Sequence, residues 1–285
     1  MPLATTDSPL LLLPGLWHGS WCWSEVVAEL AGAGRASVAV DMAGHGLQAR
    51  REPRWYTRRS YDPEAVATEV SPVADVHLDD AAELLTAQMR LVGGGAPVTV
   101  VAHSASGIVL TRVAQETPEL LARAVYLTAF MPASGVPPAT YNGIPEAGEY
   151  RLGPLFTGDP AVTGALRLDL ATEDPAYREA FREVMYHDVA PDLADAAMGL
   201  LTPDAPVGIT LGTTTLTANG FGSVPRTYIT CSRDVALRPA VQDRFIAEAD
   251  AAFPHNPTSV ADLPSSHSPF LSMPRELASV LRDLG

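Results

Sequence analysis

The sequence contains no lysine, and all 19 of its basic residues are arginine. This absence excludes chemistries that need a lysine from the chain itself, such as a Schiff base, a phosphate-binding P-loop or a Ser-x-x-Lys hydrolase. Positive charge is also scarce, because 33 acidic residues leave a formal net charge of −14. Such a chain repels phosphate backbones and anionic lipid, so we expect no nucleic-acid partner and no membrane surface.

Cysteine and long apolar runs are scarce as well. Cys22 and Cys231 cannot form a disulfide framework. The first residues lack the positive segment of a signal peptide, and no run of eighteen apolar residues predicts a transmembrane helix. The histidines show no metal-binding spacing, so we expect no metal and no other cofactor. We expect a soluble cytoplasmic protein that is a monomer or a homodimer.

Short apolar strands and amphipathic helices alternate along most of the chain. Because strand and helix follow each other in turn, the pattern predicts an α/β fold with a doubly wound, mostly parallel sheet. The predicted strands cover residues 10–13, 36–40, 98–102, 124–127 and 227–231, and the predicted helices cover residues 23–33, 78–91, 106–116, 240–249 and 275–284.

The alternation stops over residues 133–222. This stretch holds proline and glycine clusters and two helical patches, at 177–186 and 193–201, with no obvious sheet strand. Insertions of this kind commonly cover active sites. We therefore predict an α/β core of residues 1–132 and 223–285, with residues 133–222 as a helical cap.

The segment from Val98 to Gly107 predicts a nucleophile. A strand ends, Ser104 follows, and a helix begins at once, which is the layout of a nucleophile elbow. That sharp turn needs small residues two positions before and after the serine, and Ala102 and Ser106 meet this need in place of glycine. The alternative is that Ser104 only caps the following helix.

A nucleophilic serine needs a histidine base, which in turn needs a carboxylate to orient it. In this type of fold the chain order is serine, acid, histidine. Of the three histidines after Ser104, only His267 lies in a polar loop before the last helix. Asp234 follows the 227–231 strand, at the sheet edge where ligand sites lie, and Asp262 is the alternative acid. We predict that Ser104, Asp234 and His267 are catalytic.

The oxyanion formed on attack needs two backbone N–H donors, and we predict these to be Leu16 and Ala105. Arg54 or Arg58 is expected to fold over the entrance. Further side chains that we expect in the substrate pocket are Trp17, His18, His103, Ser106, Phe156 and Met185.

Together these motifs resemble the α/β-hydrolase superfamily, most closely its plant methylesterase and hydroxynitrile lyase branch with bacterial esterase relatives. Five segments carry the resemblance: Leu12 to Trp23, with its doubled His-Gly and Trp-x-Trp spacing, Asp41 to Gly46, the serine elbow, 228–234 and Ser266-His267. Pro14 stands where the family has its first histidine. The resemblance implies Ser104 as nucleophile, His267 as base and Asp234 as orienting acid.

The same resemblance favours ester hydrolysis over lyase chemistry. Lyases similar to this chain have a lysine directly after the catalytic histidine and a threonine at the glycine of the oxyanion loop. Here those positions hold Ser268 and Gly15. The expected partner is a small-molecule ester or lactone. Two alternatives remain open: a lyase, cyclase or acyl-transferase of secondary metabolism, and a ligand-binding protein with a silent triad.

Overall fold

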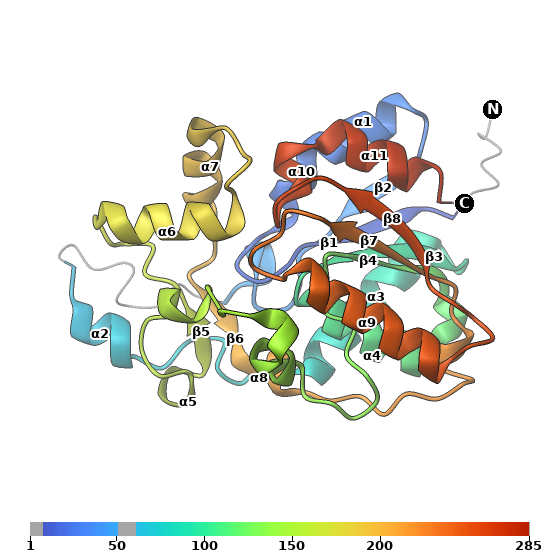
Figure 1. The fold of residues 1–285 in the computed structure, drawn as a ribbon, viewed down its shortest axis with the longest axis horizontal. Helices are drawn as coiled ribbons and strands as arrows, with labels where there is room; N and C mark the ends of the chain where they lie inside the picture. Colours follow the sequence, from blue (N-terminus) through green and yellow to red (C-terminus); the bar gives the residue numbers. More distant parts are fainter. Residues whose placement is uncertain (1–7, 51–60, 285) are drawn as a thin grey trace.

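The computed structural model describes residues 8–50 and 61–284. These residues contain a six-stranded sheet in which every neighbouring pair is parallel, with strand order β2-β1-β3-β4-β7-β8 (Figure 1). The predicted α/β fold with a doubly wound sheet is confirmed. The strands are β1 (Leu10–Leu13), β2 (Ser37–Ala39), β3 (Val98–His103), β4 (Leu121–Leu127), β7 (Arg226–Cys231) and β8 (Ser259–Leu263).

Helices cover both faces of this sheet, which is why its central strands β3 and β4 are mostly apolar and mostly buried. Side chains alternate between the faces: Leu10 and Leu12 join one core, and Leu11 and Leu13 join the other. The first face is covered by α1 (Ser24–Gly32), α10 (Pro269–Ser272) and α11 (Pro274–Arg282), and the second by α3 (Leu78–Gly93), α4 (Ser106–Glu116) and α9 (Pro239–Ala252).

Strand β8 lies at the edge of the sheet and was not among the predicted strands. Its residues Ser259, Val260 and Asp262 are exposed, so the segment lacks the apolar pattern of a buried strand. Pairing with β7 nevertheless holds it in register, with Tyr228 opposite Val260. This edge strand leads directly into the loop that carries His267.

The elements of residues 133–222 lie to one side of the sheet, together with α2 (Pro63–Thr68). They include a short antiparallel ladder that the sequence pattern did not predict, formed by β5 (Ala165–Arg167) and β6 (Asp204–Pro206). The division into core and cap stays a prediction. The helices of this region are η4 (Pro138–Gly143), η5 (Pro145–Ala147), η6 (Gly153–Leu155), α5 (Pro160–Thr163), α6 (Pro175–Met185), α7 (Pro191–Met198) and α8 (Val207–Leu211).

Short 3-10 helices connect several of these elements. They are η1 (Ser20–Trp23), η2 (Gly46–Gln48), η3 (Pro118–Leu120) and η7 (Phe221–Ser223). Among the helices of residues 8–50 and 61–284, none is both long enough and apolar enough to cross a bilayer.

A buried ion pair fastens the β5–β6 ladder to α2. The Arg167 guanidinium donates to both carboxylate oxygens of Asp204, at 2.6 and 2.8 Å, and both side chains are almost fully buried. The same guanidinium donates to the carbonyl oxygens of Val66 and Glu69, at 2.7 and 2.9 Å. One charged side chain therefore links three segments that are distant in the sequence.

Candidate active site

Ser104 sits on a sharp turn between β3 and α4. Its backbone has a φ of +55°, a left-handed conformation that a serine adopts only when the surrounding structure enforces it. The Ser104 carbonyl accepts a hydrogen bond from the Phe130 N–H at 2.9 Å. A Cβ at Gly107 would lie 2.2 Å from the Phe130 carbonyl oxygen, so glycine lets α4 approach this loop closely. This is the geometry of the predicted elbow.

Ser106 occupies a position where the turn tolerates only a small residue. Its hydroxyl donates to the carbonyls of His103 and Leu13, at 2.7 and 3.3 Å, and the side chain is fully buried. The predicted pocket role of Ser106 is therefore wrong, because its hydroxyl is bound to the protein backbone beneath the turn.

Ser104, His267 and Asp234 come together at the ends of three different strands. His267 Nε2 lies 2.9 Å from Ser104 Oγ, and His267 Nδ1 lies 2.6 Å from Asp234 Oδ2. His267 and Asp234 are almost completely buried, whereas Ser104 is partly accessible. The structure thus brings together the three residues that the sequence singled out.

The surroundings of Asp234 fix both carboxylate oxygens. Oδ1 accepts the backbone N–H groups of Ala236 and Leu237, at 2.8 and 2.9 Å. Oδ2 accepts the Thr128 hydroxyl at 2.5 Å as well as the His267 ring. Because a carboxylate only accepts, His267 carries its proton on Nδ1 and presents the Nε2 lone pair to the Ser104 hydroxyl.

Asp262, the alternative acid, lies elsewhere. It is an exposed residue of the edge strand β8, and its carboxylate accepts the Thr230 hydroxyl at 2.8 Å. Its surroundings show no contact with the His267 ring, which Asp234 already holds.

The two residues predicted to supply the oxyanion donors lie at the cavity beside Ser104. Leu16 and Ala105 both line this cavity, and neither N–H has a hydrogen-bond acceptor within the part of the chain that the structure describes. A Cβ at Gly15 would lie 2.7 Å from His103 Nδ1 and 2.8 Å from Ser104 Cβ, so only glycine lets this loop pass so close to the serine. The pair of free donors is suited to an oxyanion.

His18 supports the Leu16 peptide from behind. Its Nδ1–H donates to the Leu16 carbonyl at 2.9 Å, because a carbonyl can only accept, and its Nε2 accepts the Tyr186 hydroxyl at 2.7 Å. Both side chains are buried, and neither lines the cavity. The predicted pocket contact of His18 is therefore wrong. It instead links the Leu16 loop to the residue that follows α6.

His103 and Met185 also lie behind the cavity wall. The His103 Nε2–H donates to the His267 carbonyl at 2.8 Å, and the His103 ring packs edge-on against Phe270. Met185 is on the apolar face of α6, which turns into the protein core. Their predicted pocket contacts are wrong, because both side chains are enclosed by the protein and neither lines the cavity.

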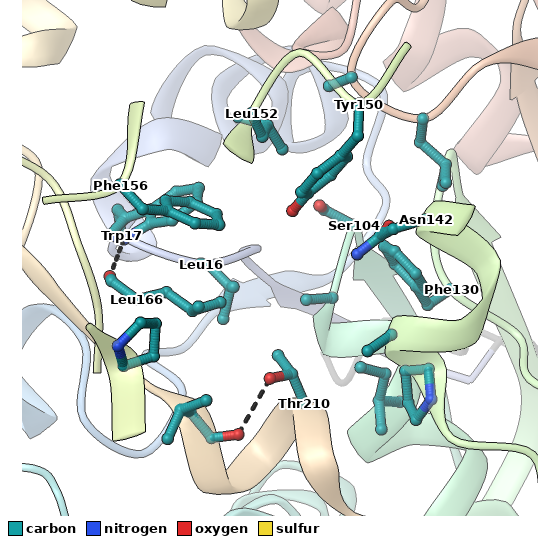
Figure 2. A pocket seen from close by; sticks show the side chains of 18 of the residues that line it. Leu16, Trp17, Ser104, Phe130, Asn142, Tyr150, Leu152, Phe156, Leu166 and Thr210 are labelled. Atoms are coloured by element: carbon teal, nitrogen blue, oxygen red, sulfur yellow. Dashed lines mark hydrogen bonds between the residues drawn. The ribbon is translucent and has the colours of Figure 1, made fainter. Parts of the chain in front are cut away.

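The cavity beside Ser104 measures about 320 Å³ and is mostly apolar (Figure 2). Trp17 and Phe156 line it as predicted, with ring centroids 6.0 Å apart. Trp17 has a φ of +64° and is held by its ring N–H, which donates to the Leu166 carbonyl at 2.8 Å. Arg54 and Arg58 fall outside the described residues.

Most of the remaining lining was missed by sequence reasoning. Much of it comes from loops, the 3-10 helix η4 and the short elements α5, β5 and α8, which have too little periodic hydrophobic pattern to mark an inward face. The sequence feature that could have pointed to these lining residues is the run of aromatic, proline and asparagine residues between 130 and 156. The missed residues are Ile108, Phe130, Pro138, Ala139, Asn142, Tyr150, Leu152, Pro160, Leu166, Val207, Thr210, Leu211, Ala236 and Leu237.

Buried neutral histidines predict a pH-dependent stability. Burial lowers the pKa of His18 and that of His45 from 6.5 to about 4. Above pH 6.5 both are neutral in the folded and unfolded chain. As the pH falls toward 4, only the unfolded chain takes up these protons, so the free energy of unfolding should fall by about 1.4 kcal/mol per pH unit for each histidine.

Urea unfolding between pH 7.5 and 5 measures this slope. His45→Gln should reduce it by the contribution of one histidine, whereas His187→Gln, at an exposed position, should leave it unchanged. An unaltered slope in His45→Gln would contradict the prediction.

Comparison with known proteins agrees with this architecture. The model of a family described as "Alpha/beta hydrolase family" matches residues 10–280. Methylesterase 9 of Arabidopsis thaliana is 29% identical over 285 residues, covering 95% of each chain. Methyl jasmonate esterase 1 of Vitis vinifera is 25% identical, covering 96% of this chain and 95% of its own. A solved pyrethroid hydrolase structure is 25% identical with a TM-score of 0.74, covering 98% of this chain and 97% of the other.

Proposed function

The chain belongs to the alpha/beta hydrolase family, in its methylesterase-like branch, and on this premise we propose that it hydrolyses small to medium, largely apolar carboxylic esters or lactones. The proposal rests on two hydrogen bonds, which link Asp234 to His267 and His267 to Ser104. Ser104 and His267 line an apolar cavity that can hold the substrate. The names of the relatives, among them methylesterases and a pyrethroid hydrolase, support an ester as the substrate.

The geometry supports a two-step reaction. Ser104 Oγ attacks the ester carbonyl carbon while His267 Nε2 takes the hydroxyl proton. Negative charge develops on the carbonyl oxygen, where the N–H groups of Leu16 and Ala105 donate to it. His267 returns the proton to the departing alcohol oxygen, which leaves an acyl group on Ser104. Water then loses a proton to His267 and attacks the acyl carbon. His267 passes this proton to Ser104 Oγ as the acyl–oxygen bond breaks, which releases the acid and restores the serine hydroxyl.

The surroundings of Ser104 favour hydrolysis over cyanohydrin cleavage. Departing cyanide needs a positive neighbour, and the sequence contains no lysine. Position 15 also has no room for the threonine of those lyases unless the loop moves, because even a Cβ at Gly15 would lie less than 3 Å from His103 and Ser104.

A substrate panel tests the proposal. We expect turnover of p-nitrophenyl esters of short acyl chains, some lactones and methyl esters of aromatic acids, with only a modest preference among neighbours. The preference is modest because an apolar pocket distinguishes two substrates that differ by one methylene by only about 1–3 kcal/mol of binding free energy in the transition state. Release of acid and alcohol is measured by chromatography, with Ser104→Ala as the inactive control. Lack of turnover on the whole panel would contradict general esterase function.

A further inference from the structure

Two polar side chains of the cavity have no partner in the protein. Figure 2 shows the Tyr150 hydroxyl and the Asn142 amide pointing into the cavity, on the same side as Ser104. Neither group makes a hydrogen bond to any other residue of 8–50 and 61–284. Tyr150 is fixed by its ring, which packs edge-on against Phe156 with centroids 6.3 Å apart. Both polar groups are therefore available to a bound molecule.

The other polar side chains of the cavity are already occupied. Thr210 Oγ1 donates to the Val207 carbonyl at 2.9 Å, and the Trp17 ring N–H donates to Leu166. Ser104 and His267 are bound to each other. The pair Tyr150 and Asn142 therefore differs from the remainder of a mostly apolar wall.

The chemistry of this wall defines what the pair would bind. The described lining residues include no arginine and no carboxylate, so the cavity offers no countercharge for an ionised group. Burial raises the pKa of Tyr150 to about 12, so its hydroxyl stays protonated and can donate. An asparagine amide can also donate. A neutral oxygen that accepts hydrogen bonds matches both groups.

We propose that Tyr150 and Asn142 form a recognition site for a neutral oxygen substituent, such as a hydroxyl or an ether, close to the scissile ester of the substrate. This inference rests on the proposed ester hydrolysis and narrows its substrate class to oxygenated esters. An ester without that oxygen leaves both groups unpaired in the closed complex, which weakens its binding.

Matched hexanoate esters test the proposal. The reference is methyl hexanoate, and the oxygenated probes are methyl 2-hydroxyhexanoate, methyl 3-hydroxyhexanoate and 2-methoxyethyl hexanoate, which place the oxygen on either side of the ester. Each kcat/KM is divided by the rate of hydroxide-catalysed hydrolysis to remove intrinsic reactivity. At least one oxygenated ester should be preferred over the reference by about tenfold.

Variants assign that preference to the two side chains. Tyr150→Phe keeps the ring and Asn142→Ala keeps the backbone, and each should reduce the preference several-fold. Thr210→Val is the matched control: it removes a hydroxyl from the same wall, but one already bound to Val207, so the preference should persist.

The outcomes separate this inference from the proposed function. If the wild type hydrolyses all four esters without preference, or if Tyr150→Phe and Asn142→Ala both retain the wild-type ratio, the recognition site is overturned and esterase activity stands. If the wild type hydrolyses none of the four, the proposed function fails with it. For each variant, kcat/KM on an oxygenated ester is divided by kcat/KM on methyl hexanoate. Partial loss of folded protein lowers both values equally, so it does not change this ratio.

Discussion

Replacement of Asp234 by asparagine is expected to lower kcat by about 10⁴-fold while the fold is retained. The reason lies in the two backbone N–H groups of Ala236 and Leu237, which require an acceptor at the Oδ1 position. The amide oxygen must stay there, so the NH₂ group faces the His267 ring. His267 Nδ1 then has to accept, its proton moves to Nε2, and the Ser104 hydroxyl loses its proton acceptor.

The matched control is Asp262→Asn on the exposed edge strand, which should leave kcat near the wild-type value. Both variants are assayed with a p-nitrophenyl ester, and circular dichroism reports their folding. Severe loss in Asp262→Asn together with a mild effect in Asp234→Asn would reverse the assignment of the acid.

Replacement of Asp204 by alanine is expected to destabilise the protein by roughly 3–5 kcal/mol, because it leaves the buried Arg167 guanidinium without its carboxylate. The backbone carbonyls of Val66 and Glu69, which also accept from this guanidinium, carry no charge that could replace the carboxylate. Since β5 also carries Leu166, which lines the cavity and holds Trp17, turnover should fall with stability.

Urea unfolding measures the effect of this change. Glu179→Ala, which breaks an exposed ion pair with Arg182, is the control and should leave the midpoint nearly unchanged. The double variant Arg167→Met and Asp204→Leu removes both charges and should recover much of the lost stability. A midpoint for Asp204→Ala close to that of Glu179→Ala would contradict the importance of this pair.

The sheet and the three central residues of the site could be predicted from the sequence because local signals mark them. Strand β3 is a continuous apolar run, Ser104 follows it directly, and α4 begins at once. Asp234 follows the predicted 227–231 strand, and His267 lies in a polar loop before the last helix, in the chain order of this fold. Such signals depend on a few adjacent residues, so no knowledge of distant contacts was needed.

The cavity wall could not be predicted in the same way. Helical periodicity in α6 and α7 marks a face that is buried, but it cannot show whether that face meets the cavity or the core. Met185 packs into the core, while Asn142 in the 3-10 helix η4 and Tyr150 in a loop reach the cavity. Strand β8 was missed because an exposed edge strand has no apolar alternation.

The most direct test of the account is the covalent labelling of Ser104 by a fluorophosphonate, followed by intact-mass measurement of the folded protein. We expect one adduct per chain, located on Ser104 by peptide mapping. It should be absent in Ser104→Ala and form much more slowly in His267→Ala, because the hydroxyl there lacks its base. Folded wild-type protein that forms no adduct, or forms it equally well in Ser104→Ala, would contradict the assignment of Ser104 as the nucleophile.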